Sequence, residues 1–472
     1  MGSQQKVIAA IEIGSSKIKG AVGTIDEFGT LTVQAVETVA VTDTVRYGWI
    51  RNVSAVSAVL NNIIRQLENR MAPRKIESIY VGIGGRSLRA DERNVERQLA
   101  QEVEIKAPLL ENLSNEARQI PDYTDRDVVG VIPCEYRVDG TVTSQPVGMM
   151  GRNIRGNFRI VTCKQQQRRN LEMVVLQKLN LRINDFIVRP LAQGNLLLTR
   201  EEISLGCMLV DFGAETTTVS IYKNGALRYL STIPLGSRLI TRDIMSLNFM
   251  EEQAEEIKRA SGSSMGQPTA IGGTQSVNMT EINNYISARV KEIIANIKAQ
   301  LQFAGLSSAD LPAGIVIVGN GAKLNGFNSR LSAETKMQVR AGTPGAVVRI
   351  SDGSINPTEM VDIISVLYSA TLSNPMECTV MPMPEVVVEP EPQPQPVYQK
   401  PQPEPAHQTA APQPRTVPEP EPTVEPQPEM PSYQNTGEKS RGKRSRWDKF
   451  REKLNIFLQE DEGDFNEDLR DD

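Results

Sequence analysis

Two short stretches combine an acidic residue, a glycine and hydroxyl side chains in the same order. The first reads Glu-Ile-Gly-Ser-Ser-Lys at 12–17, and the second reads Asp-Phe-Gly-Ala-Glu-Thr-Thr at 211–217. Glycine lets the backbone approach an anion closely, and successive N–H groups beside hydroxyls can hold phosphate oxygens. A nearby carboxylate can hold Mg²⁺ through water. Each stretch alone is also typical of an ordinary β-hairpin turn. Because the same pattern occurs twice, a second interpretation has equal weight: the two stretches belong to similar halves of the molecule that hold one phosphate chain between them.

A third glycine turn follows a wholly apolar run. Ile315–Val318 leads into Gly319-Asn320-Gly321, and a helix is expected next. Strand, glycine turn and helix N-terminus together can accept a flat ring or a phosphate against backbone N–H groups. Glu255 and Lys258 lie one turn apart on an expected helix, where a solvated ion pair is the plain alternative to a ligand contact.

Apolar and periodic stretches predict the elements that position these residues. Around the first turn Lys6–Ile13 and Ile18–Thr24 are expected strands, and around the second Leu205–Val210 and Thr218–Tyr222 repeat the arrangement. The other expected elements are strands at Leu31–Val41, Ile79–Ile83, Val128–Val138, Asn157–Thr162, Asp185–Val188 and Ala226–Ile233, a polar strand pair at Arg93–Ile105, and helices at Val53–Leu67, Leu171–Leu179, Ile240–Leu247, Glu251–Ala260 and from the N-cap Thr280 to Ala304.

Composition narrows the classes of function. The length of 472 residues indicates several domains, and the net charge of −5 gives no reason to expect nucleic acid as a partner. The four cysteines are widely spaced, which argues against a zinc site and against a disulfide framework. No apolar run is long enough to predict a membrane span. The single histidine, His407, lies in a proline-rich segment, so the sequence disfavours a histidine base.

The C-terminal residues form a separate pattern. Glu385–Pro431 is dense in Pro, Glu and Gln and predicts an extended tether rather than a packed core. Beyond it, Arg446–Gln459 predicts an amphipathic helix. Its apolar face is Trp447, Phe450, Leu454, Phe457 and Leu458, and its basic residues include Arg444, Arg446, Lys449, Arg451 and Lys453. Such a helix favours an anionic membrane surface, with docking on the globular part or on a calmodulin-like partner as alternatives.

An acidic stretch at 460–472 ends the sequence. We hypothesise that it competes for the basic helix or repels anionic lipid, and a plain solvated tail is an equal alternative.

The order of these motifs resembles the actin, Hsp70 and hexokinase superfamily, and within it the FtsA family of bacterial cell-division proteins. The closest cues are Leu209–Asp243, Cys134–Gly140 with the loop Pro146–Met149, and the tail. The resemblance implies an α/β, actin-like two-lobed nucleotide-binding fold with an inserted small α+β subdomain, then a disordered linker and a C-terminal amphipathic helix. The expected parts are lobe 1 at 1–85 and 165–190, the insert at 86–164, lobe 2 core at 191–238 and 312–384, its upper subdomain at 239–311, the linker at 385–438, the helix at 439–459 and the acidic tail at 460–472.

The resemblance also implies ATP and Mg²⁺ between the lobes. Phosphates would meet Gly14, Ser15, Ser16 and Lys17 on one side and Gly213, Ala214, Thr216 and Thr217 on the other. Glu255, Lys258, Gly319, Asn320 and Gly321 would contact adenosine, with Glu12 and Asp211 near the metal. Glu12 replaces the commoner Asp, Ala214-Glu215 a Gly-Gly pair and Asn320 a central Gly, and the added Cβ atoms near the phosphates are expected to weaken nucleotide affinity. No catalytic residue is assigned, and at most weak ATPase activity is expected.

The implied function is to polymerise and to tether the FtsZ ring to the cytoplasmic face of the inner membrane at the division site. The implied partners are the FtsZ C-terminal peptide at the upper subdomain, further copies of the chain, anionic lipid and other division proteins. The alternative is a sugar or metabolite kinase of the same superfamily, which would have no use for the basic amphipathic tail.

Overall fold

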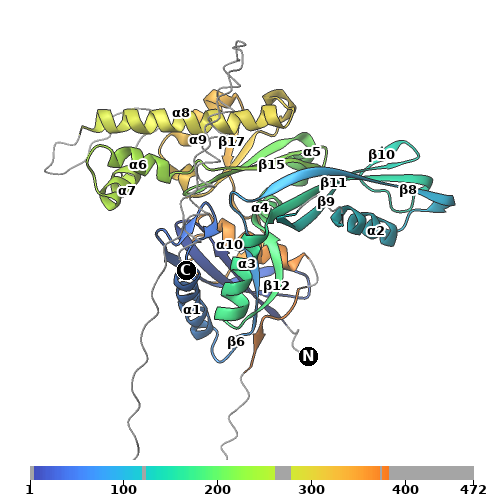
Figure 1. The fold of residues 1–472 in the computed structure, drawn as a ribbon, viewed down its shortest axis with the longest axis horizontal. Helices are drawn as coiled ribbons and strands as arrows, with labels where there is room; N and C mark the ends of the chain where they lie inside the picture. The colour runs from blue at the N-terminus through green and yellow to red at the C-terminus, as the bar shows by residue number, and fades with distance from the viewer. Residues whose placement is uncertain (1–4, 120–123, 261–277, 373–374, 382–472) are drawn as a thin grey trace, which may run out of the picture. The chain divides into compact units, whose positions relative to one another are not determined.

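The computed structural model describes residues 5–119, 124–260, 278–372 and 375–381. Their strands form three main sheets (Figure 1). Two of these sheets are built in the same way. The predicted loop at 261–277, the linker at 385–438, the helix at 439–459 and the acidic tail at 460–472 lie outside the described residues.

The first sheet has the strand order β12-β7-β1-β2-β3-β18. Its strands are β1 (Lys6–Ile13), β2 (Lys17–Ile25), β3 (Leu31–Ala40), β7 (Ser78–Ile83), β12 (Arg182–Val188) and β18 (Val348–Ile350). β1, β2 and β3 pair antiparallel, whereas β7 joins β1 and β12 joins β7 in parallel. The predicted strand from Lys6 to Ile13 is confirmed, and seven of its eight residues are buried.

Helices cover both faces of this sheet, which explains why most side chains of its central strands are apolar. The neighbours Lys19 and Gly20 in β2 point to opposite faces. Lys19 pairs with Asp362 of α10 (Val361–Thr371), while a Cβ on Gly20 would lie 2.5 Å from Ile63 of α1 (Val53–Arg70). α4 (Arg189–Leu197) packs beside α10.

The second sheet repeats this construction in the order β15-β14-β13-β16-β17. Its strands are β13 (Cys207–Phe212), β14 (Thr217–Lys223), β15 (Ala226–Ile233), β16 (Ile315–Val318) and β17 (Val339–Ala341). As in the first sheet, the opening hairpin is antiparallel and two parallel strands follow on its other side. α6 (Arg238–Met245), α7 (Glu251–Ala260), α8 (Met279–Phe303) and α9 (Phe327–Thr335) contribute buried side chains to its core.

The third sheet has the order β10-β9-β11-β8 and its own small core with α2 (Ala107–Arg118). Its strands are β8 (Arg89–Glu104), β9 (Arg126–Val138), β10 (Thr141–Thr143) and β11 (Met150–Lys164). The polar strand pair predicted at Arg93–Ile105 is wrong. One sixteen-residue strand occupies the region, because β11 pairs with it from Arg89 to Glu104 around a single bulge.

Several other boundaries differ from the sequence expectations. Leu205 is the last residue of α5 (Arg200–Leu205), and the strand begins at Cys207. Gly206 between them has a φ of 114°, which ends the helix. The cap of α8 is Asn278 rather than Thr280, since the Asn278 side chain accepts the N–H of Glu281. The helix expected at Leu171–Leu179 is α3 (Gln165–Glu172) continued by a π-helical segment, Met173–Lys178.

The remaining elements are short. They are β4 (Val45–Arg46), β5 (Trp49–Ile50), β6 (Lys75–Ile76), β19 (Thr379–Val380) and the 3₁₀ turns Ser308–Asp310 and Asn320–Lys323. β19 pairs with β6, and the N–H of Cys378 donates to the carbonyl of Val7 at 2.8 Å. Within the described ranges, no helix combines the length and apolarity that a membrane span requires.

Candidate functional site

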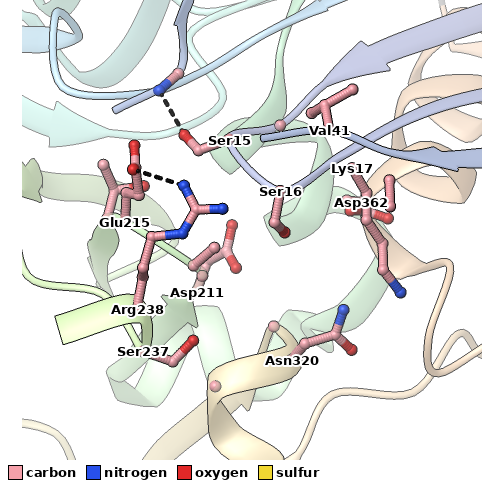
Figure 2. Close-up of a pocket in the computed structure, with 18 of the residues that line it drawn as sticks. Ser15, Ser16, Lys17, Val41, Asp211, Glu215, Ser237, Arg238, Asn320 and Asp362 are labelled. Atoms are coloured by element: carbon pink, nitrogen blue, oxygen red, sulfur yellow. Dashed lines mark hydrogen bonds and ion pairs between the residues drawn. The ribbon is translucent and has the colours of Figure 1, made fainter. Parts of the chain in front are cut away.

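The three glycine turns meet at one cavity of about 660 Å³. The hairpin turns β1–β2 and β13–β14 supply one part of its lining, and the turn after β16 supplies another. Figure 2 shows Ser16, Asp211 and Asn320 around the same open space. Fourteen of the fifteen residues that the sequence analysis assigned to nucleotide and metal line this cavity, namely Glu12, Gly14, Ser15, Ser16, Lys17, Asp211, Gly213, Ala214, Thr216, Glu255, Lys258, Gly319, Asn320 and Gly321.

Thr217 is the residue of that set that the cavity lining lacks. It is fully buried in β14, and its hydroxyl donates to the carbonyl of Leu235 at 2.5 Å. The Thr217 side chain therefore stabilises the segment that leads from β15 into α6.

The two hairpin turns have the same internal geometry. The N–H of Gly14 donates to the carbonyl of Lys17 at 3.0 Å, and that of Gly213 donates to Thr216 at 2.9 Å. A Cβ would lie 2.9 Å from the Lys17 oxygen at the first glycine and 3.1 Å from the Thr216 oxygen at the second. Any larger residue would crowd this hydrogen bond, so the glycines serve the turn itself as well as access to a ligand.

The third turn packs directly on the second. Gly319 has a φ of 90°, and a Cβ there would lie 2.3 Å from the carbonyl oxygen of Phe212. At Gly321 a Cβ would lie 2.8 Å from the Phe212 ring. These glycines thus allow the turn after β16 to close on the end of β13, while Asn320 between them lines the cavity.

Glu215 connects the two halves across the cavity. Its carboxylate accepts the N–H of Tyr47 at 2.6 Å and forms an ion pair with Arg238 at 3.1 Å, which Figure 2 shows beside Asp211. The neighbouring Gly48 N–H donates to the Ser15 hydroxyl at 2.9 Å. The departure from a Gly-Gly pair at this turn therefore has a structural role, because the side chain makes a contact that glycine cannot.

The pair Glu255 and Lys258 is more enclosed than a surface ion pair. Their charged atoms are 2.6 Å apart, the Lys258 side chain is 10% exposed, and both bond to the Thr241 hydroxyl of α6. Burial lowers the pKa of Lys258. Burial alone would raise the pKa of Glu255, but the hydrogen bond and charge of Lys258 outweigh it and lower that pKa.

Arg189 stands between the two acids that the sequence analysis placed near Mg²⁺. Its guanidinium is 2.9 Å from Glu12 and 3.3 Å from Asp211. Burial raises the pKa of Glu12 to about 7; Arg189 and Lys19 act in the opposite direction, and Asp362 and Asp211 add to the rise. Both carboxylates already have a cationic partner at ion-pair distance. This donor set does not fit a Mg²⁺ ion bound directly by the protein.

Lys19 and Asp362 also line the cavity without having been singled out from the sequence. Their charged atoms are 2.6 Å apart, and the Lys19 side chain is 4% exposed. Burial would raise the pKa of Asp362, yet the charge of Lys19 lowers it below its ordinary value. Two features of the sequence could have pointed to these charged residues of the cavity. Lys19 lies inside an otherwise apolar strand, and Arg189 stands directly before the proline that opens a helix.

The doubled sheet and the cavity between its hairpin turns define a mixed α/β, actin-like fold that carries an inserted domain. A family model described as "Cell division protein FtsA" matches residues 208–376, and one described as "SHS2 domain inserted in FTSA" matches residues 85–162. The FtsA of Porphyromonas gingivalis is 30% identical over 339 residues, which cover 69% of this chain and 70% of that protein. The FtsA of Pseudomonas aeruginosa is 26% identical over 377 residues, covering 77% of this chain and 89% of the relative.

The chain belongs to the FtsA family of bacterial cell-division proteins. Among solved structures, the PilM–PilN type IV pilus biogenesis complex is similar in fold, with a TM-score of 0.55 and 17% identity over 77% of this chain and 97% of the matched chain.

Proposed function

We propose that this chain binds ATP in the cavity and uses it as a ligand for closure and assembly. The observation that carries the proposal is the convergence of the three glycine turns, two of them with the same N–H to carbonyl geometry, on one lining. Backbone N–H groups and Lys17 would meet the phosphates, while Glu255, Lys258 and Asn320 would meet the nucleoside. A ligand that contacts both halves favours the state in which they are close together.

ATP in this proposal shifts a conformational equilibrium, and no residue is assigned as a hydrolytic base. Isothermal titration calorimetry with ATP tests the binding step. A binding signal with the full chain that is lost when Lys17, which lines the cavity, is replaced by Ala would support the site. Absence of any signal at millimolar ATP would refute it.

We further propose that the chain polymerises and anchors the division ring to the cytoplasmic face of the inner membrane. The support is family membership together with the sequence pattern of the tail, whose apolar face carries Trp447, Phe450 and Leu454 opposite basic residues. About 1 kcal/mol for each basic residue near an anionic surface, added to burial of the rings, gives reversible binding. Several tails in one filament bind far more strongly than a single tail. Family membership favours this function over that of a sugar or metabolite kinase.

Liposome co-sedimentation tests the anchoring. The full chain should pellet with phosphatidylglycerol vesicles, more so with ATP, whereas a chain ending at Pro431 should stay in the supernatant. A full-length variant with Phe450→Glu should also stay in solution, and Phe28→Glu, which changes a phenylalanine that is 86% exposed in the globular part, should not. Equal pelleting of the full and truncated chains would contradict the proposal. Truncation after Gln459 should strengthen binding if the acidic end opposes it.

For the division ring itself, we propose that the segment 239–311 receives the C-terminal peptide of FtsZ. Its described part contains α6, α7 and α8, with Met250 and Tyr285 among its exposed apolar side chains. Fluorescence anisotropy with a labelled FtsZ C-terminal peptide tests the interaction. Tyr285→Glu should weaken binding and Phe28→Glu should leave it unchanged.

A further inference from the structure

Each buried acid of the cavity already faces an arginine. Glu12, Asp211 and Glu215 are 3%, 6% and 6% exposed. Arg189 lies against the first two and Arg238 against the third. Burying a carboxylate without a partner costs free energy, because the charge loses its hydration. These arginines therefore compensate the buried acids and are part of the folded site.

Arg189 is held in this place from several sides. It is the first residue of α4, its side chain is 14% exposed, and its two terminal nitrogens contact acids from different halves of the molecule. The backbone at Gly84 passes so close that a Cβ there would lie 3.0 Å from Nε and 3.2 Å from Nη2. The guanidinium is therefore confined between the two carboxylates.

A divalent ion bound to these two carboxylates would have to displace the guanidinium or lie beside its charge. Mg²⁺ also demands oxygen ligands at about 2.0–2.1 Å in octahedral geometry. Lys17, at the start of β2, also lines the cavity and can meet phosphate.

We propose that Arg189 takes the place of the divalent metal at the phosphate site, so that this chain binds a nucleoside triphosphate without needing Mg²⁺. This inference rests on the proposed nucleotide site and specifies how that site is charged. Arg189 offsets one carboxylate charge, blocks the metal position and, together with Lys17, faces the phosphates. Planar guanidinium groups suit such double contacts, because they present two N–H donors in a fixed geometry.

Calorimetry with ATP on the full chain tests the proposal, with EDTA in one arm and excess Mg²⁺ in the other. The wild type should bind with affinities that differ by less than about threefold, well inside the tenfold that corresponds to about 1.4 kcal/mol. Binding only in the Mg²⁺ arm would overturn the inference and leave the nucleotide site standing. No binding in either arm would overturn both.

Arg189→Gln exposes the two carboxylates and should create the metal dependence that the wild type lacks. Its ATP affinity should fall about tenfold or more in EDTA and recover with Mg²⁺. Arg182→Gln, which changes an arginine outside the lining whose side chain is 75% exposed, should behave like the wild type. An Arg189→Gln protein that folds and remains indifferent to Mg²⁺ would overturn the inference.

Mn²⁺ provides a readout that needs neither nucleotide nor the variant. In a titration followed by electron paramagnetic resonance, the wild-type chain should show no stoichiometric Mn²⁺ site of micromolar affinity, because its two acids are occupied. A stoichiometric site of micromolar affinity that Glu12→Gln abolishes would refute the proposal even if Arg189→Gln fails to fold.

Discussion

Glu215 provides the sharpest test of how the two halves are held together. Its carboxylate accepts the N–H of Tyr47 from the first half and pairs with Arg238 of the second, and the side chains of the ion pair are 5% and 14% exposed. Tyr47 has a φ of 52°, a conformation that a bulky residue adopts only where its surroundings enforce it. Glu215→Ala would leave the Tyr47 N–H without its acceptor and the largely enclosed Arg238 guanidinium with the more distant Glu251, at 3.8 Å, as its acidic partner.

The expected cost follows from that burial. Breaking a buried ion pair by removing one partner costs about 3 kcal/mol. This corresponds to about 100-fold in the equilibrium constant for opening the contact between the two halves at Tyr47. Glu215→Gln should cost about 1 kcal/mol, because its amide oxygen still accepts the Tyr47 N–H. Glu251→Ala is the matched control, since Glu251 is 3.8 Å from the same Arg238, is 44% exposed, and should cost less than about 0.5 kcal/mol.

Hydrogen–deuterium exchange at the Tyr47 amide measures this opening directly. Exchange should be fastest in Glu215→Ala, intermediate in Glu215→Gln, and close to the wild type in Glu251→Ala. The reasoning fails if the Tyr47 amide exchanges in Glu215→Ala at the wild-type rate while the protein remains folded.

Three further expectations follow from individual contacts. Gly319→Ala should lower the melting temperature more than Gly225→Ala: both glycines have positive φ, but a Cβ meets the Phe212 carbonyl at 2.3 Å at the first and nothing within 4 Å at the second, so equal shifts in scanning fluorimetry would contradict the packing argument. The pKa of Asp362 is lowered in the folded state, so its stabilising effect is present above the ordinary value of 3.8 and is lost as pH falls through the lower folded value. The difference in unfolding free energy between wild type and Asp362→Asn, measured by urea titration, should therefore disappear in that acidic range. A difference that stays constant with pH would refute this. Arg289→Lys should cost about 1 kcal/mol in the same assay, since Arg289 contacts both oxygens of Asp243 at 2.7 and 2.8 Å and lysine cannot, whereas a neutral result would show that the paired geometry adds nothing.

The local parts of the fold could be predicted from the sequence because their signals are local. An apolar run that ends in acid, glycine and hydroxyls specifies a strand and a tight turn within a dozen residues, and β1 and β16 have the predicted bounds. The repetition of the pattern also raised two similar halves as an equal alternative to ordinary hairpin turns, and the first two sheets share one strand arrangement.

What the sequence could not provide are partners that lie far apart along the chain. Arg189 reaches Glu12 across 177 positions, and Glu215 reaches Tyr47 across 168. No periodicity links such residues, because their contact depends on how the two sheets pack. The polar strand β8 was misjudged for a related reason: an exposed strand lacks the apolar alternation that would mark its full length, and its pairing with β11 decides where it ends.

The short strand β19 determines how a mechanical load would enter the molecule. Residues 375–381 are fastened to the beginning of β1 by Cys378 donating to Val7, by the Val7 N–H donating to Glu377, and by Lys6 donating to Pro375. Tension on the segment that follows is therefore delivered to the first strand of the first half. The two-residue ladder to β6 shares it, as do the N–H groups of Glu77 and Ser78, which donate to the carbonyl of Cys378. A pull on the tail acts on the strand that carries Glu12, at the end opposite to the glycine turn.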